Sequence, residues 1–319
     1  MVYDLKTIRE TWRKEDLKSA HGDMWRYAPV LPSSVEEAVT LVEGWTPLVR
    51  ARGLERELGA QEIWLKDESR NPAGSMEARR FSAITSSAKG LGVRKLSMAS
   101  DGSAASALAA YAAAAELEAR IYMPRHAPQS VFIECKALGA NVRLVDGGMD
   151  DCARLAGETR EDSMEVEALD AFGREGAKTL VYEVAEQFGW QVPDAIVHSG
   201  DERDAMAFEK AWKELEELNW IGAGRPRTVA AQPGSVQNEE ALDQALLMAR
   251  CDGIFPTLET GACVAAARGM LRDGKAKPEN RIVIVNAGAG LKQIEKYATR
   301  YSRQGASEQD KLGGLITPR

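Results

Sequence analysis

Short apolar runs that end in small residues alternate along this chain with helical stretches. The runs are IWLKDE (63–68), KLSMASDGS (95–103), ARIYMP (119–124), NVRLVDGG (141–148), DAIVHSGDE (194–202), RTVAAQPGS (227–235) and RIVIVNAGAG (281–290). Such short strands, separated by helices, are typical of parallel sheets that are covered on both faces. The pattern predicts an α/β fold built from doubly wound parallel sheets.

Ligands of doubly wound folds bind at the carboxyl ends of the strands, near helix N-termini. Three loops follow predicted strands in this way, and each carries small or polar residues. They are Ser100–Ser106, His198–Asp204 and Asn286–Gly290. We therefore expect a binding site where these loops meet.

Composition excludes several classes of protein. The net charge is -7, with 48 acidic and 41 basic residues, so no basic surface for nucleic acid is expected. The four cysteines and three histidines are scattered, which argues against a metal site and suits reduced thiols. The first residues are too charged for a secretory signal, and no run is long enough to span a membrane. A cytoplasmic protein is predicted.

The start of the chain is expected to form an arm over residues 1–40. Its first 30 or so residues suggest a polar helix, followed by an irregular stretch closed by prolines. Ser33 and Ser34, followed by Glu36 and Glu37, form overlapping capping-box patterns. These patterns predict that a short helix begins there.

Several ordered segments resemble threonine synthase, a fold-type-II enzyme that depends on pyridoxal phosphate (PLP). They are EGWTPL (43–48), WLKDE (64–68), NPAGS (71–75), YMPRHAP (122–128), GAKT (176–179), EQFGW (186–190), GIF (253–255) and GLK (290–292). One such segment would be weak evidence, but the ordered series covers nearly the whole chain.

The resemblance implies two lobes with the cofactor between them, and usually a homodimer. It suggests a smaller lobe over residues 60–165 and a larger lobe made of 41–59 and 166–319. Between QPGS (232–235) and NEE (238–240) the family has several dozen further residues, part of the wall on the substrate side, that this chain lacks. The amino-terminal zinc ribbon of many relatives is also missing.

The lysine that holds PLP in the family lies in a motif resembling NPTGSFKDRG. This chain has NPAGSMEARR at 71–80, so Glu77 stands at the lysine position. The lysine forms an aldimine, which requires a neutral amine, and a carboxylate cannot replace it. We expect Glu77 to be an exposed residue of a first helical turn, favoured by the helix dipole, rather than a catalytic base.

A second family motif resembles S-T-G-N and starts the helix that binds the substrate carboxylate. Ser100, Asp101, Gly102 and Ser103 occupy it here, so Ser103 replaces the asparagine that contacts the cofactor ring. These four residues are candidate ligand-binding residues, because a helix N-terminus attracts anions. We expect the Asp101 side chain to cap this helix instead.

The phosphate-binding loop of the family resembles G-N-G-T-T. The matching residues here are Gly200, Asp201, Glu202, Arg203 and Asp204, which carry three carboxylates and one guanidinium. Each pair of like unit charges about 4–5 Å apart costs about 3–4 kcal/mol at an effective dielectric constant near 20. The loop is therefore predicted to be closed to phosphate in the usual mode.

The fourth family contact is a threonine, in a motif resembling L-T-G-N-G-L-K, that binds the pyridine nitrogen of PLP. Ala287 stands at that position and has no hydroxyl. Lys66 and Lys292 match lysines that the family keeps for structure, so neither is expected to replace the missing one. No cofactor is therefore expected, although the family uses PLP.

Other readings of the charged residues stay open. His198, Ser199 and Asp201 suggest a nucleophile dyad or triad, but no GxSxG motif supports it. The acidic loop could bind magnesium. Its carboxylates could instead pair with Arg80 or Arg203 and close the old site, which we favour. His126 matches the family and is expected to be structural.

The leading hypothesis is a threonine-synthase-like pseudoenzyme, acting in regulation or assembly through a protein partner or by binding a non-phosphorylated small ligand. A second hypothesis is an enzyme whose acid/base chemistry, through Glu77 and the acidic loop, no longer needs PLP. A third is residual non-covalent PLP-dependent lyase or β-replacement activity on amino acids. The first predicts a filled, or a shallow and acidic, cleft, and the second an open pocket in which the pKa of Glu77 is perturbed.

Overall fold

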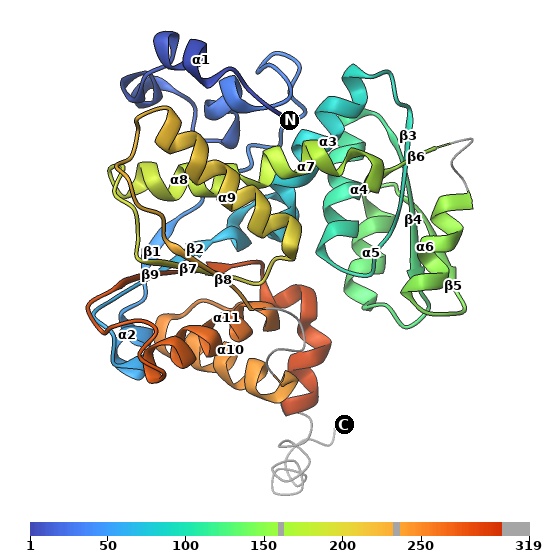
Figure 1. Cartoon of the computed structure of the whole chain (residues 1–319). Helices are drawn as coiled ribbons and strands as arrows, with labels where there is room; N and C mark the ends of the chain where they lie inside the picture. Colours follow the sequence, from blue (N-terminus) through green and yellow to red (C-terminus); the bar gives the residue numbers. More distant parts are fainter. Residues whose placement is uncertain (159–162, 232–236, 302–319) are drawn as a thin grey trace, which may run out of the picture.

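The protein, represented by a computed structural model, has two lobes, each built around its own sheet (Figure 1). The structure describes residues 1–158, 163–231 and 237–301. Helices alternate with strands through both lobes, and most strand pairs are parallel. The predicted α/β fold with parallel sheets in two lobes is confirmed.

The larger lobe contains a five-stranded sheet in the order β1-β2-β9-β7-β8. Only β1 is antiparallel to its neighbour among these described strands. The strands are β1 (Leu48–Arg50), β2 (Glu62–Asp67), β7 (Ala195–His198), β8 (Arg227–Ala230) and β9 (Arg281–Asn286). The inner strands β7 and β9 are buried along nearly their whole length, as expected for a sheet covered on both faces.

The smaller lobe contains a four-stranded parallel sheet in the order β5-β4-β3-β6. Its strands are β3 (Lys95–Ala99), β4 (Glu118–Pro124), β5 (Asn141–Val145) and β6 (Met164–Glu165). The expected boundary at residue 60 lies too early for this sheet, because Glu62–Asp67 pairs with β9 in the larger sheet. The alternating sequence predicted this strand but could not choose its partner, which lies more than 200 positions along the chain.

Helices cover both faces of the larger sheet. Two of them, α8 and α9, pack on one face with Ile196 and Val283, whereas α2, α10 and α11 pack on the other with Ile282 and Ile284 (Figure 1). Their bounds are α2 (Arg52–Leu58), α8 (Thr179–Gln187), α9 (Glu202–Glu217), α10 (Asn238–Asp252) and α11 (Leu258–Arg272). Neighbouring residues of β9 thus point to opposite layers, which is the period-2 geometry of a strand.

In the smaller lobe, α3, α4 and α5 pack together with β3 and β4, and α6 packs against Tyr122 and Val145. The alanine-rich helix α4 is buried along most of its length, and its small side chains allow close packing. The helices are α3 (Glu77–Gly90), α4 (Ser103–Ala115), α5 (Gln129–Ala137), α6 (Met149–Glu158) and α7 (Asp170–Ala177). The helix α7 lies against α3, where the lobes meet (Figure 1).

The N-terminal arm packs onto the larger lobe and is less helical than predicted. It contains α1 (Leu5–Thr11) and two 3₁₀ segments at Lys14–Ser19 and Met24–Val30. The short helix expected at Ser33 and Ser34 is wrong, since only a turn forms there. The reason is a tertiary contact. After the turn that the Ala38 amide closes on Val35, the Val39 amide donates to Ser86 Oγ on α3 at 2.8 Å and so cannot extend a helix.

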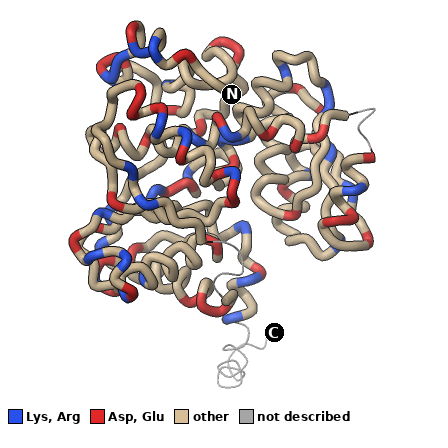
Figure 2. The backbone as a smooth tube through the Cα atoms, in the orientation of Figure 1, with Lys and Arg blue, Asp and Glu red and all other residues tan. Residues whose placement is uncertain are grey.

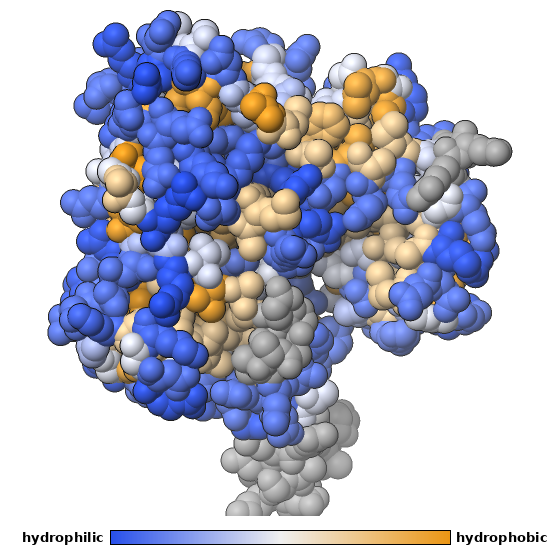
Figure 3. All heavy atoms as spheres, in the orientation of Figure 1, coloured by the Kyte–Doolittle hydropathy of each residue, from blue (hydrophilic) through white to orange (hydrophobic). Residues whose placement is uncertain are grey.

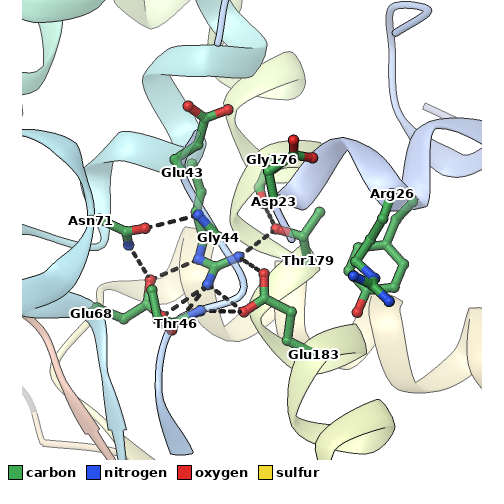
Figure 4. A network of polar contacts seen from close by, with 12 residues as sticks. Asp23, Arg26, Glu43, Gly44, Thr46, Glu68, Asn71, Gly176, Thr179 and Glu183 are labelled. Atoms are coloured by element: carbon green, nitrogen blue, oxygen red, sulfur yellow. Dashed lines mark hydrogen bonds and ion pairs between the residues drawn. The ribbon is translucent and has the colours of Figure 1, made fainter. Parts of the chain in front are cut away.

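A buried ion-pair network anchors α3 to the larger lobe. Arg79 donates to Glu68 and Glu183 at distances between 2.5 and 2.9 Å, and Lys66 Nζ lies 2.7 Å from Glu183. Glu68 and Glu183 thus share the Arg79 guanidinium, and Figure 4 shows these two carboxylates close together, with Thr46 and Thr179 beside them. Because Arg79 is fixed in this way, the α3 residues on either side of it are held in place as well.

None of the described helices is long and apolar enough to cross a membrane. All four cysteines lie among the described residues and are free thiols. The predicted site of the missing family residues, at 232–235, lies outside the described part of the chain.

Candidate functional site

A cavity of about 470 Å³ lies between the lobes, and nearly all the candidate residues from the sequence line it. Those that line it are Glu77, Ser100, Asp101, Gly102, Ser103, Gly200, Asp201, Arg203, Asp204 and Ala287. Glu202 is the exception. The strand-end loops therefore do converge, and Figure 3 shows a hollow between the lobes.

Glu77 is the first residue of α3 and faces this cavity. The expected helix start is correct, but the side chain is only 25% exposed, so the expectation of an exposed residue is wrong. Burial raises the pKa of the Glu77 carboxyl; Arg80 opposes the shift and Asp204 adds to it. A buried carboxylate with few donors favours its protonated form.

Arg80 supplies the main positive charge of the cavity. Its Nη1 lies 2.6 Å from Asp170 and its Nη2 lies 2.9 Å from Asp204, whereas its Nε is 3.5 Å from Glu77. Arg203 pairs with Asp201 at 2.6 Å. Figure 2 shows charges of both signs along the edge of the larger lobe that faces the smaller one. The preferred pairing of the carboxylates with these arginines is therefore observed, although the cleft is not filled.

The loop before α9 has its own internal cap. Asp201 Oδ1 accepts hydrogen bonds from the backbone amides of Arg203 at 2.8 Å and Asp204 at 3.3 Å. Burial alone would raise the pKa of Asp201, yet hydrogen bonds from Arg203 take it below its usual value. A Cβ on Gly200 would lie 2.2 Å from Asp204 Oδ2, so this carboxylate stands directly over the glycine. The free backbone amides at the start of α9 are therefore already hydrogen-bonded to a carboxylate, that of Asp201.

The N-terminus of α4 differs from the expectation. The N-cap is Gly102, and no side chain among the described residues caps the helix, so the predicted capping by Asp101 is wrong. Gly102 has an extended backbone with φ -134° and ψ -154°, which directs the chain into the helix without bringing Asp101 round to the amides.

Ala287 follows β9 and presents a methyl group to the cavity. Its amide donates to Thr260 Oγ1 at 3.1 Å, and its carbonyl accepts from the amide of Met76 at 2.9 Å. Thr260 in turn donates to Asn286 Oδ1 at 2.9 Å. The Thr260 hydroxyl therefore supports the backbone of this turn.

Neither alternative reading of the charged loop gains support. His198 is buried against Phe208, and its ring nitrogens have no hydrogen-bond partner in the described structure, so no dyad with Ser199 forms. Burial lowers the pKa of His198 and so favours the neutral ring. Within the described residues, no group of three or more His, Cys, Asp or Glu side chains is placed to hold a metal ion.

The two lysines that were expected to be structural are both engaged in ion pairs. Lys66 is fully buried and bonded to Glu183 at 2.7 Å, and Lys292 Nζ donates to Glu134 at 2.7 Å. Neither is among the residues that line the cavity.

The sequence did not identify every residue of the site. Ser75, Glu167, Asp170, Thr257, Glu259 and Gln293 also line the cavity. The sequence offered a signal for Ser75, because it lies in the same motif as Glu77, two residues earlier. Asp170 and Glu259 are acidic residues in the first turns of helices, but such residues are common, and only the tertiary structure turns them toward the cavity.

Comparisons with known proteins agree with this architecture. Residues 39–237 match the family described as "Pyridoxal-phosphate dependent enzyme". The threonine synthase of Methanocaldococcus jannaschii is 28% identical over 92% of this chain and 86% of its own length. That of Methanosarcina acetivorans is 30% identical over 68% of this chain and 54% of its own length.

Solved structures show the same fold at low sequence identity. A crystal structure of O-ureido-L-serine synthase aligns with a TM-score of 0.63 and 19% identity, covering 86% of this chain and 96% of the other. A fungal L-serine ammonia-lyase from Rhizomucor miehei aligns with a TM-score of 0.65 and 18% identity, covering 80% and 98%. From its sequence match, supported by this fold, the chain belongs to the family of pyridoxal-phosphate dependent enzymes and is similar to the threonine synthases.

Proposed function

We propose that this chain is a pseudoenzyme of its family, which neither holds PLP covalently nor has threonine synthase activity. It would act as a regulatory, assembly or small-ligand-binding protein. The observation that carries the proposal is Glu77: it stands at the family's lysine position and faces the cavity, and no lysine is found among the described lining residues. A carboxylate cannot form the aldimine on which the family's chemistry depends.

The loop before α9 supports the proposal independently, because it does not fit a phosphate group. Asp201 accepts from the two amides that a phosphate would need, and the Asp204 carboxylate stands over Gly200. A phosphate there would meet two carboxylates at short range, each costing about 3–4 kcal/mol per unit-charge pair at an effective dielectric constant near 20. Arg203 offsets part of this, but it is already paired with Asp201.

The test is an absorbance scan of purified protein after addition of PLP, followed by borohydride reduction and mass spectrometry. A threonine synthase of known activity serves as the positive control. We expect the spectrum of free PLP and no covalent adduct on the protein. A shifted aldimine band, fixed by reduction onto one lysine, would oppose the proposal and reinstate threonine synthase chemistry.

One observation favours a second candidate function, an enzyme that uses acid/base chemistry without PLP. The cavity is open, and burial raises the pKa of Glu77 within it, as a general acid or base requires. The test incubates cofactor-free protein with a metabolite panel in deuterated water, followed by proton NMR. Turnover of a metabolite by the wild type that is lost in Glu77→Gln would support this candidate. If no metabolite in the panel changes, this candidate is rejected and the pseudoenzyme proposal stands.

We also propose that the chain forms a homodimer in the cytosol. The family resemblance supports the dimer, and the free thiols, three of them buried, suit a reducing compartment. Sedimentation velocity at micromolar concentration tests the assembly, and a single monomeric species would contradict it.

A further inference from the structure

Helix α3 presents one stripe of side chains to the cavity. Arg80, Phe81 and Ile84 follow Glu77 by three, four and seven positions, so all four lie on the same helical face, and all line the cavity. The stripe begins with a carboxylate and continues into apolar side chains. Met98, Met149 and Val166 add apolar surface from other elements.

The charges around the cavity are unbalanced. Among the described lining residues, seven carboxylates face two guanidiniums. The carboxylates belong to Glu77, Asp101, Glu167, Asp170, Asp201, Asp204 and Glu259, and the guanidiniums to Arg80 and Arg203. Both guanidiniums are already engaged, Arg80 with Asp170 and Asp204 and Arg203 with Asp201. The cavity therefore has room for a cation and poorly accommodates another anion.

Glu77 has the weakest contact to Arg80 of the three carboxylates around it. Their separation is 3.5 Å, whereas Arg80 approaches Asp170 and Asp204 to 2.6 and 2.9 Å. A half-buried carboxylate without a close donor is costly, because it has lost water without a full replacement. An incoming ammonium group would supply the missing donors.

A second observation points to the same place. Ser75 is 1% exposed and lines the cavity two residues before Glu77. Its Oγ has no hydrogen-bond partner in the described part of the structure. Buried hydroxyls are nearly always hydrogen-bonded, so an unpartnered one at a cavity wall suggests a group that a ligand would supply.

The chemistry of the walls narrows the class of cation. Because no cluster among the described residues is arranged for a metal ion, an organic cation fits better. The volume of about 470 Å³ is in the range of small-molecule sites, and the accessible side chains of Met98 and Met149 suit a hydrocarbon chain, whereas Phe81 and Ile84 are buried behind the wall.

We propose that the cavity binds a small aliphatic primary amine, with its ammonium group on Glu77 and Ser75 and its hydrocarbon chain against the more accessible apolar lining residues Met98 and Met149. This inference rests on the proposed function, since a PLP ring held in the same cleft would compete for this space. The inference assigns the small ligand of the proposed pseudoenzyme to one chemical class, the primary amines.

Proton release is the signature of this arrangement. The charged groups that act most strongly on Glu77 are Arg80 on its own helix, with Asp201, Arg203 and Asp204 at the start of α9. Asp170 on α7 lines the same cavity and shares Arg80. Burial raises the pKa of Glu77 and so favours its protonated form in the free protein. An ammonium ion favours the carboxylate, so binding should release that proton and tighten as the pH rises through the raised pKa of Glu77.

The test is isothermal titration calorimetry of the full chain with pentan-1-amine as the probe. Pentan-1-ol and pentanoate have the same hydrocarbon chain with neutral and negative heads. We expect the amine to bind at least about tenfold more tightly than either, a difference of about 1.4 kcal/mol. Repeating the titration in buffers of different ionisation enthalpy should show proton release by the wild type.

Glu77→Gln should weaken amine binding by about tenfold or more and abolish the proton release. The matched control is Glu57→Gln, which removes one charge from an exposed part of α2 that does not line the cavity, and it should bind as the wild type does. Circular dichroism confirms that both variants are folded. If Glu77→Gln does not fold, the head-group series and proton release of the wild type still decide the question.

The proposal is overturned if the amine does not bind, if it binds no better than the alcohol, or if folded Glu77→Gln binds it equally well. A parallel titration with PLP, read by absorbance and borohydride reduction, separates this from the proposed function. If the amine does not bind and the PLP spectrum is unshifted, only the proposed amine site is rejected. A reducible PLP adduct removes the pseudoenzyme proposal whatever the amine does.

Discussion

The guanidinium of Arg80 on α3 lies 2.9 Å from the Asp204 carboxylate on α9. The same side chain is 2.6 Å from Asp170 on α7 and is only 10% exposed. One cation therefore joins three helices at the wall of the cavity between the lobes. Because this ion-pair cluster lies at the cavity wall, a change of charge there should also change the stability of the fold.

Arg80→Met should lower the free energy of unfolding by about 3 kcal/mol, because it leaves Asp170 and Asp204 without their cation at a largely buried position. Urea unfolding followed by circular dichroism measures the change. The control is Arg125→Met, which removes an exposed pair with Asp146 and should change stability by less than about 1 kcal/mol. Equal effects of the two variants would show that the buried cluster adds no particular stability.

Glu77→Gln should stabilise the protein at neutral pH and lose this advantage in acid. Burial raises the pKa of Glu77 in the folded state, so its contribution to stability is fully present below the unfolded pKa and lost as the pH rises through the folded pKa. Gln remains neutral throughout. Urea midpoints of both proteins at about pH 4 and about pH 8 check this, and a constant difference would contradict it.

Glu77→Lys restores an amine at the family's lysine position, yet we expect it to form no stable PLP aldimine. The Asp201 cap and the Asp204 carboxylate over Gly200 still oppose the phosphate. Reduction with borohydride and mass spectrometry should find little adduct. Adding Asp201→Gly and Asp204→Ser should increase the yield, and full labelling of the single variant would contradict the role of this loop.

Glu183→Gln should destabilise the protein by about 3 kcal/mol, since it leaves Arg79 and Lys66 short of a buried counter-charge. Burial would raise the pKa of Glu183, but Arg79 and Lys66 hold it at about 2. Its stabilising contribution is therefore present above the unfolded pKa and lost as the pH falls toward about 2.

Thermal unfolding between about pH 6 and about pH 3 measures the Glu183 effect, and the variant should show a flatter decline in acid than the wild type. The matched control is Glu186→Gln on the same helix, where the side chain is 13% exposed and pairs with Arg26. It should lose less stability, because Arg26 keeps its hydrogen bonds to the carbonyls of His21 and Leu17. A larger loss in the control would contradict the importance of the Glu183 network.

The sequence alone determined the α/β class and the convergence of three strand-end loops. The reason is local: short apolar runs followed by small residues predict buried parallel strands, whose carboxyl ends lie at one edge of the sheet. It also placed Glu77 at a helix start. These features depend on periodicity and on motifs within a few residues, which a single chain records directly.

Only the tertiary structure decided what those loops present to the cavity. It showed that Asp101 does not cap α4, that Glu77 is partly buried rather than exposed, and that β2 pairs with β9 in the larger lobe. It also placed Asp170 and Glu259 at the cavity, although nothing in the sequence around them distinguishes them as site residues. Burial, ion pairing and the sheet to which a strand belongs depend on residues far apart in the chain, so local patterns could not determine them.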